Sequence, residues 1–136
     1  MNSISDLQLI ELPRFSGDNG ELFVVEADSH LPMSIARVFV VRAGEGAIRG
    51  QHAHRLCSQV LFCVHGAIRV SCDDGSSQRD IELGSPEHAI LVPPSIWGEQ
   101  TFLTRDSVLV VLCDRKFEEK DYIRNRIEFD RYRLGE

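Results

Sequence analysis

The sequence lacks the segments that would place a protein in or across a membrane. No apolar stretch in the 136 residues approaches the length that a bilayer requires, and residues 1–15 lack the basic start and apolar core of a signal peptide. We therefore expect a cytoplasmic protein that does not bind membranes. A chain of this length is typical of one ordinary domain, so we expect a single domain over residues 1–136.

An excess of positive charge is also missing. The formal net charge is −6, which disfavours binding to nucleic acid and to anionic membrane surfaces. We therefore expect no nucleic-acid partner. A negative total still allows a local basic pocket, and such a pocket would suit a phosphorylated small molecule.

Cysteine is scarce, and no two cysteines form a CxxC pair. The four are Cys57, Cys63, Cys72 and Cys113, and the last three lie in apolar, strand-like runs. This usage favours reduced, mostly buried thiols that pack as small hydrophobic side chains, rather than a redox motif or a zinc ribbon.

Repeats, low-complexity segments and linkers are absent as well. What recurs is a short run rich in Val, Ile, Leu and Phe followed by turn residues, for example at 35–41, 58–64, 67–72 and 107–113. Short, evenly spaced runs of this kind are typical of an all-β sandwich or barrel. Only residues 117–134 differ, because they are highly charged, and we expect a short helix or an irregular arm outside the barrel.

Two histidines lie one residue apart in front of a strongly apolar run. Because side chains alternate along a strand, His52 and His54 point to the same face. They could be core histidines with satisfied hydrogen bonds. However, two histidines on one face, beside Gln59 and close to Arg49, are hard to explain as packing, because buried polar groups cost free energy unless each finds a partner. The cluster favours a binding or catalytic site inside the barrel.

The spacing around these histidines resembles the first motif of the cupins. Gly46, His52, His54, Gln59 and Gly66 keep every interval of that motif, with glutamine at the position of its glutamate. The resemblance implies an all-β cupin jelly roll, also called a double-stranded β-helix, with a short C-terminal helical or irregular segment.

The residues that remain make a poor metal site. In the second cupin motif, which corresponds here to PPSIWGEQ, the position of the histidine ligand falls on Gly98. Two neutral imidazoles and an amide lack the carboxylate or thiolate that normally completes a catalytic metal site. We therefore expect no metal and no other cofactor.

Several stretches together resemble one family within the cupins. RGQHAHR, Gln59, DDG at 73–75, LVPPSIW and DYIRNRIEF are similar to the dTDP-4-keto-6-deoxyglucose 3,4-ketoisomerases, the WxcM-like sugar isomerases. The resemblance implies a metal-independent isomerase that converts dTDP-4-keto-6-deoxyglucose to a dTDP-3-keto-6-deoxyhexose in deoxysugar biosynthesis. It also implies a homodimer with an N-terminal strand exchanged between subunits. One departure is Phe39, because members of the family usually carry a tyrosine in this strand.

This reaction requires a base and groups that stabilise an enediolate. Histidine can act as a base near neutral pH without further perturbation. We assign the base to His52 and a shuttling or oxygen-binding role to His54, and the two roles are interchangeable at this point. The amide of Gln59 can donate a hydrogen bond to a sugar oxygen, where a glutamate would repel the enediolate.

Four further residues are candidates for binding the substrate. Arg49 could pair with a phosphate, with Arg37 and Arg69 as further phosphate candidates, and Trp97 could stack on the base or cap the pocket. Each has a structural alternative, namely a surface arginine or a tryptophan in the core.

Two other functions compete with the isomerase. The first is a non-catalytic cupin module that binds a nucleotide sugar, which the absence of a tyrosine at Phe39 would suit. The second is a metal-dependent cupin enzyme, which Gln59 and Gly98 disfavour.

Overall fold

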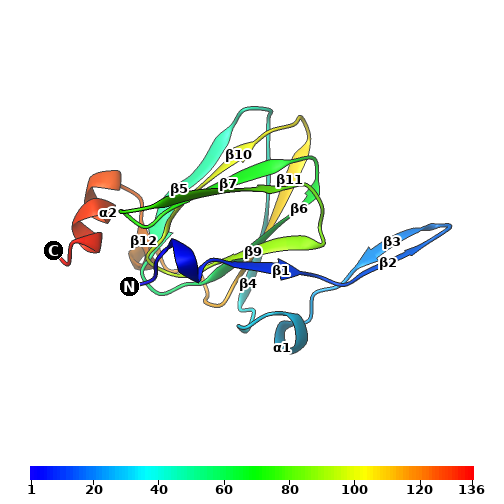
Figure 1. Cartoon of the computed structure of the whole chain (residues 1–136), viewed down its shortest axis with the longest axis horizontal. Coiled ribbons are helices and arrows are strands. Elements are labelled where there is room, and N and C mark those ends of the chain that lie inside the picture. The colour runs from blue at the N-terminus through cyan, green and yellow to red at the C-terminus, as the bar shows by residue number, and fades with distance from the viewer.

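The computed structural model describes residues 1–136. Two five-stranded antiparallel sheets enclose its core (Figure 1). The first sheet has the order β1 (Gln8–Glu11), β9 (His88–Val92), β6 (Gln59–His65), β11 (Ser107–Cys113) and β4 (Arg37–Ala43). The second has the order β12 (Tyr122–Ile123), β5 (Ile48–His54), β10 (Trp97–Phe102), β7 (Ile68–Asp73) and β8 (Gln78–Leu83). This architecture confirms the predicted all-β jelly-roll barrel.

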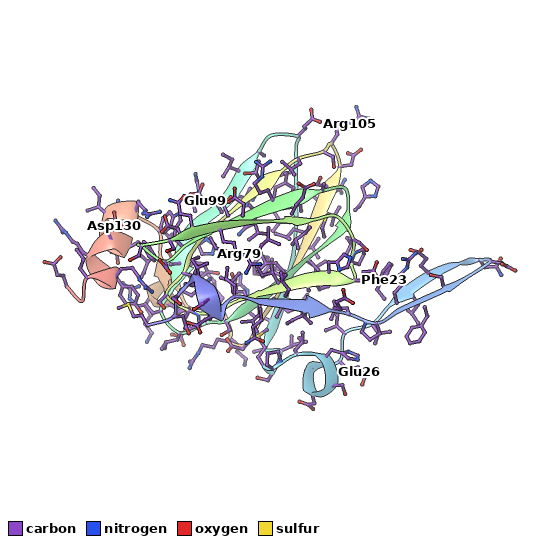
Figure 2. The ribbon with its side chains drawn as sticks, viewed as in Figure 1. Phe23, Glu26, Arg79, Glu99, Arg105 and Asp130 are labelled. Carbon is purple, nitrogen blue, oxygen red and sulfur yellow. The ribbon has the colours of Figure 1, made fainter.

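Alternation of side chains along the strands builds the core between the sheets. Inward-facing residues of both sheets form one apolar cluster, which includes Leu61, Cys63, Ile68, Val70, Phe102, Leu109 and Val111. All four cysteines are buried and unpaired, as the sequence predicts. Charged side chains such as Arg105 and Asp130 lie on the periphery instead, as Figure 2 shows.

The N-terminal third covers the outer face of the first sheet and then leaves the barrel. Leu12 and Leu31 pack against Val60, Leu91 and other outward-facing residues of that sheet. Between them, β2 (Arg14–Gly17) and β3 (Gly20–Phe23) form a hairpin that projects from the barrel, followed by α1 (Ala27–His30) (Figure 1). The hairpin pairs only with itself.

The charged tail ends in a helix, one of the two outcomes predicted for it. A 3₁₀ turn at Glu119–Asp121 leads into β12, and α2 (Arg126–Arg133) follows outside the barrel (Figure 1). Asn125 caps this helix by accepting hydrogen bonds from the backbone of Ile127 and Glu128, as a side-chain amide commonly does at a helix start. Phe129 anchors the helix in a small cluster with Trp97. No helix of the structure is both long and apolar enough to cross a membrane.

A β-bulge in β5 sets the direction of the two histidines. Gly98 of β10 lies opposite His52, whereas the next residue, Glu99, lies opposite Gly50, so that Gln51 has no partner. Gly50 and Gln51 both have positive φ, 86° and 55°. A bulge bends its strand and redirects the side chains that follow it. The bulge therefore precedes His52 directly and turns the H-x-H segment toward the barrel interior.

We expect Gly66→Ala to destabilise the protein more than Gly46→Ala. Both glycines have left-handed backbone, with φ of 81° and 83°, but an added Cβ at Gly66 would lie 2.4 Å from the Ser107 hydroxyl whereas nothing lies within 4 Å at Gly46. Backbone strain costs each variant about 1–2 kcal/mol, and overpacking costs Gly66→Ala about 1–3 kcal/mol more. Urea unfolding curves measure both, and equal midpoints would contradict the clash at Gly66.

Candidate active site

An open cavity of about 480 Å³ lies between the two sheets and contains a concentration of positive charge. Four arginines line it, namely Arg37, Arg42, Arg49 and Arg124, and no acidic side chain does. This is notable in a protein whose net charge is −6. Cavities lined by charge of one sign concentrate ligands of the opposite sign, so this cavity suits an anionic small molecule.

The two histidines of the H-x-H segment occupy different positions relative to this cavity. His52 lines it, whereas His54 is buried behind His52 and lines only a small internal void of about 20 Å³. Their rings are edge to face with centroids 5.0 Å apart. The two side chains share a face, as predicted, but only His52 can reach a ligand in the cavity.

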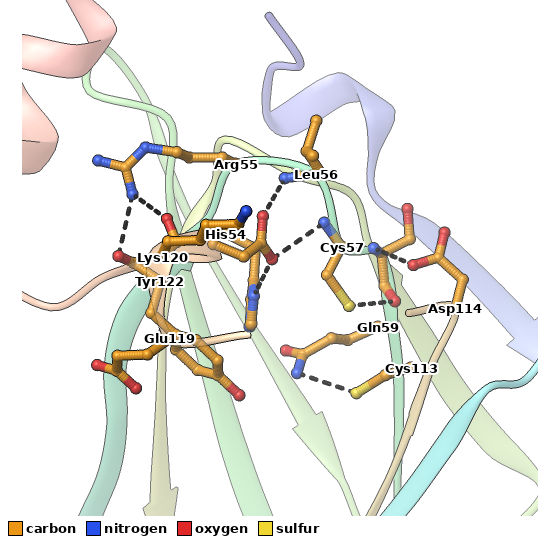
Figure 3. A network of polar contacts seen from close by, with 12 residues as sticks. His54, Arg55, Leu56, Cys57, Gln59, Cys113, Asp114, Glu119, Lys120 and Tyr122 are labelled. Carbon is orange, nitrogen blue, oxygen red and sulfur yellow. Dashed lines mark hydrogen bonds and ion pairs between the residues drawn. The ribbon is translucent and has the colours of Figure 1, made fainter. Parts of the chain in front are cut away.

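A partly buried carboxylate holds His54 in one orientation. Nδ1 of His54 lies 2.9 Å from Oδ2 of Asp121, and the same carboxylate accepts hydrogen bonds from the backbone N–H groups of Leu56 and Cys57 (Figure 3). Because a carboxylate only accepts, Nδ1 of His54 carries the proton. Its Nε2 is therefore unprotonated, and it is buried without a partner.

Burial keeps both imidazoles neutral. Loss of solvent and the neighbouring His54 lower the pKa of His52 from 6.5 to about 4. The pKa of His54 is also lowered by burial, although Asp121 opposes this shift. The sequence analysis expected a base that titrates near neutral pH, whereas burial first, and then the neighbouring His54, disfavour the charged form of His52 and move its pKa below that range. The result is an imidazole that stays unprotonated well below neutral pH.

Gln59 is buried beside His52, and its amide is already partly engaged. Nε2 donates a hydrogen bond to Sγ of Cys113 at 3.4 Å. One amide hydrogen and the carbonyl oxygen remain for a ligand in the cavity. The residues at the ligand positions of the two cupin motifs do not fit a metal ion, because Gly98, directly opposite His52, offers no side chain and Gln59 offers no charge.

Tyr122 brings a hydroxyl to the histidines that the sequence analysis did not assign to the site. The pairing of β12 with β5 places Tyr122 opposite His54, and its ring lies 5.0 Å from that of His52 and 4.3 Å from that of His54. Its hydroxyl oxygen accepts a hydrogen bond of 2.9 Å from Nη1 of Arg37. The sequence analysis expected only a helix or an irregular arm from residues 117–134 and therefore missed this polar group of the cavity wall.

Three of the five predicted binding residues line the cavity and two do not. Arg37, Arg49 and Gln59 are brought together there with His52. Arg69 is exposed on the outer face of β7, and lies outside the cavity because its neighbours Ile68 and Val70 are the residues that point inward.

Trp97 also lies outside the cavity. It packs with Ala53, Ile123 and Phe129 beneath α2, and its indole N–H donates to Glu99. Trp97 is therefore a core residue, which is the structural alternative that the sequence analysis named for it.

Comparison with known proteins identifies the family. Residues 5–134 match the FdtA family model, described as WxcM-like, C-terminal. The chain belongs to this family. A TDP-4-oxo-6-deoxy-α-D-glucose-3,4-oxoisomerase from Aneurinibacillus thermoaerophilus is 35% identical over 126 residues, which are 92% of this chain and 91% of the relative.

Solved structures of sugar ketoisomerases share the fold over nearly the whole chain. QdtA, a sugar 3,4-ketoisomerase from Thermoanaerobacterium thermosaccharolyticum in complex with TDP, is 27% identical, with 98% of each chain covered and a TM-score of 0.93. The TDP-quinovose 3,4-ketoisomerase WlaRB from Campylobacter jejuni is also 27% identical, with 94% and 99% covered and a TM-score of 0.87. The predicted membership of the WxcM-like family is confirmed.

In this WxcM-like chain, several lining residues lacked any local sequence signal. Arg42 lies in β4 and Gln100 in β10, and no motif surrounds either residue. Arg124, Phe117 and Tyr122 belong to the charged tail. The one available clue was the departure at Phe39, which leaves the strand without a hydroxyl and directs attention to the remaining tyrosines.

We expect the ring of His52 to stay neutral until the pH approaches about 4. In the unfolded chain the same ring protonates near 6.5, so the unfolded state binds more protons between these values. The contribution of His52 to the free energy of unfolding is therefore complete above pH 6.5 and is lost as the pH falls toward 4. NMR titration of the ring protons measures this pKa.

The variant His52→Asn provides the control, because asparagine does not titrate. Between neutral pH and pH 4 it should lose less of its free energy of unfolding than the unsubstituted protein. A ring pKa of 6 or higher for His52, or parallel loss of stability in both proteins, would contradict the assigned burial effect.

Proposed function

We propose that this WxcM-like protein converts TDP-4-keto-6-deoxyglucose to its 3-keto isomer. The observation that carries the proposal is an unprotonated histidine, His52, on the wall of a cavity lined by arginines. The relative from Aneurinibacillus thermoaerophilus is named as an oxoisomerase of the same substrate. A histidine-to-asparagine variant of QdtA, which is 26% identical to this chain, forms a complex with TDP-4-keto-6-deoxyglucose. These findings favour an isomerase over a module that only binds a nucleotide sugar.

His52 is the base in this proposal. The C3 hydrogen is acidic because it lies next to the C4 carbonyl, and its removal by the imidazole leaves an enediolate. The proton then returns at C4, and the carbonyl appears at C3. The electrons stay within the sugar, so the reaction balances without a redox cofactor or a metal.

The positive charge of the cavity serves the anionic parts of the substrate and intermediate. Arg42 and Arg49 form no ion pair with any side chain of the protein, whereas Arg124 is paired with Glu119 at 2.7 Å. Unpaired guanidinium groups on β4 and β5 are therefore available for the diphosphate. Arg37 and the free amide hydrogen of Gln59 remain for the sugar oxygens and stabilise the enediolate.

Incubation with TDP-4-keto-6-deoxyglucose in deuterated water, followed by NMR, tests the reaction. We expect a 3-keto product and exchange of deuterium into the C3 and C4 positions. His52→Asn should lower both rates by about 10³-fold or more, because general-base catalysis contributes a rate enhancement of this order.

The matched control is His88→Asn, because His88 is an exposed histidine outside the cavity. It should leave both rates unchanged. Tight binding of the substrate without exchange or product would show a non-catalytic module, and an active His52→Asn variant would remove His52 from the role of base.

The proposal extends to a homodimer that exchanges N-terminal strands. The β2–β3 hairpin projects from the barrel with Phe15 and Leu22 about 60% exposed, and β4 carries Val38 and Val40 at 58% on a sheet edge. Apolar side chains on a projecting hairpin and on an open edge favour a protein partner. A second copy of the chain supplies both surfaces at once and satisfies two-fold symmetry.

Light scattering after size exclusion tests the assembly. We expect twice the mass of the 15.4 kDa chain, and a monomeric mass for a variant with Phe15→Asp and Leu22→Asp, because these changes place charges in the contact. The matched variant Asp18→Asn, at the tip of the hairpin, should remain dimeric. A monomeric unsubstituted protein would contradict the dimer.

We also propose that residues 1–136 act as one domain in the cytoplasm. One barrel with a continuous core supports the first statement. Four unpaired cysteines support the second, since they are typical of a reducing compartment.

A further inference from the structure

Two of the four cysteines lie beside the candidate active site. Cys113 of β11 pairs with Arg37 of β4 on one side and with Gln59 of β6 on the other. Residues directly opposite one another in neighbouring strands point to the same face of a sheet, and both Arg37 and Gln59 line the cavity. Cys113 is therefore flanked by a cation and an amide of the cavity wall, whereas a cysteine of the apolar core would meet hydrophobic side chains alone.

Cys57 brings a second thiol to Cys113 from the turn between β5 and β6. The backbone ties the two segments together, because the N–H of Asp114 donates to the carbonyl of Ser58 and the N–H of Ser58 donates to the carboxylate of Asp114. A side-chain hydrogen bond links the thiols of Cys57 and Cys113. Nε2 of Gln59 donates another to Sγ of Cys113 at 3.4 Å (Figure 3).

The surroundings of Cys113 favour its thiolate. The hydrogen bond from Cys57 lowers the pKa of Cys113 to about 7, with smaller contributions from Gln59 and Arg37, and burial opposes this shift. The same hydrogen bond and burial raise the pKa of Cys57, so Cys113 is the member of the pair that ionises. A thiolate is the nucleophilic form of cysteine, and cysteines close to a cation are typically the reactive ones.

We propose that Cys57 and Cys113 are a peroxide-sensitive pair, which forms a disulfide that switches off the neighbouring site. The oxidant is a small hydroperoxide such as hydrogen peroxide. The effect on catalysis rests on the proposed function, whereas the formation of the disulfide does not.

A small oxidant can reach the pair through the cavity. Cys57 lines the internal void of about 20 Å³, and this void shares the lining residues His52, Gln59, Leu61 and Gln100 with the cavity. A single layer of side chains therefore separates the two spaces. The void exceeds the roughly 10–15 Å³ that a water molecule requires, and hydrogen peroxide has only one oxygen atom more than water. Bulkier oxidants are excluded by the same enclosure.

The oxidation balances in atoms and electrons. The thiolate of Cys113 attacks one oxygen of hydrogen peroxide, the O–O bond breaks, and a sulfenic acid and hydroxide form. The thiol of Cys57 then displaces the hydroxyl group from this sulfur, so that an S–S bond forms, the S–O bond breaks and water leaves. The two sulfurs together lose two electrons, which reduce the peroxide. A dithiol reductant reverses the change by thiol–disulfide exchange.

The other two cysteines lack these features. Burial raises the pKa of Cys72 to about 12 and also raises that of Cys63. The thiol of Cys63 donates to the backbone carbonyl of His65 at 3.1 Å. Neither cysteine lines the cavity or the internal void. They are the hydrophobic side chains that the sequence predicts, and they supply matched controls.

A disulfide would end the hydrogen bond that positions Gln59. An S–S bond is about 2.05 Å long, which is much shorter than a hydrogen-bonded contact, so the two sulfurs must approach each other. Sγ of Cys113 also loses its negative charge and becomes a weak acceptor for the amide. On the other side, the backbone N–H of Cys57 moves relative to Asp121, to which it is bonded. Misplacement of supporting groups by about 1 Å costs up to about 10²-fold in rate.

Treatment of the reduced, folded protein with hydrogen peroxide tests the pair. We expect a peptide digest to contain a disulfide between Cys57 and Cys113, identified by the loss of two hydrogen atoms from the linked peptides. Isomerase activity on TDP-4-keto-6-deoxyglucose should fall by about tenfold or more and return when dithiothreitol is added.

Three variants assign the roles, each compared with its own reduced form. Cys113→Ser should form no disulfide and keep its activity after peroxide, and Cys113→Ala replaces it if the serine variant does not fold. Cys57→Ser should accumulate the sulfenic acid of Cys113, which dimedone labels, and further oxidation should make the loss of activity irreversible. Cys72→Ser is the matched control, because Cys72 is about as buried as Cys113, and it should respond as the unsubstituted protein does.

The outcomes separate the pair from the isomerase. Peptides that contain no link between Cys57 and Cys113 after peroxide would overturn the pair, whatever happens to the activity. A complete disulfide that leaves the activity unchanged would overturn the switch. A disulfide in a protein whose reduced form does not isomerise the sugar would overturn the proposed function and the switch, while the reactive pair remains.

Discussion

The candidate site depends on the contact between the C-terminal segment and strand β5. Asp121 binds His54 and the backbone of the following turn, and Tyr122 pairs with His54 in the sheet. Arg55 adds two hydrogen bonds to the backbone carbonyls of Lys120 and Tyr122. This contact determines the tautomer of one histidine, closes the barrel behind it and brings a phenol to the cavity. Loosening it would disturb all three features at once, because the same few residues supply them.

The electrostatics of the cavity favour a neutral base and an anionic intermediate together. Arg37 and Arg124 contribute to the lowered pKa of His52, and positive charge of this kind also stabilises an enediolate and a diphosphate. The carboxylate of Asp121 binds His54 and does not line the cavity. The two histidines of one short motif therefore have different environments, which is the physical basis for giving the cavity role to His52.

Much of the fold was predictable from local patterns. Alternating apolar runs and turn residues predict strands because the two faces of a sheet meet different surroundings, and the spacing from Gly46 to Gly66 is typical of the cupin barrel. The same patterns located His52, Gln59 and Arg49, since all three lie in or next to that motif. Arg69 illustrates the limit of such reasoning. Its charge suited a phosphate, but its position in the alternation of β7 places it on the outer face.

The sequence by itself determined the jelly roll, the family and the pair of histidines, because each depends on the spacing of neighbouring residues. Only the tertiary structure decided which histidine faces the cavity, that Trp97 packs under α2, and that Tyr122 and Arg37 meet although 85 positions separate them. Local periodicity shows which face a side chain takes. It cannot show which distant segment covers that face, because this depends on how the strands pair and how the chain closes the barrel.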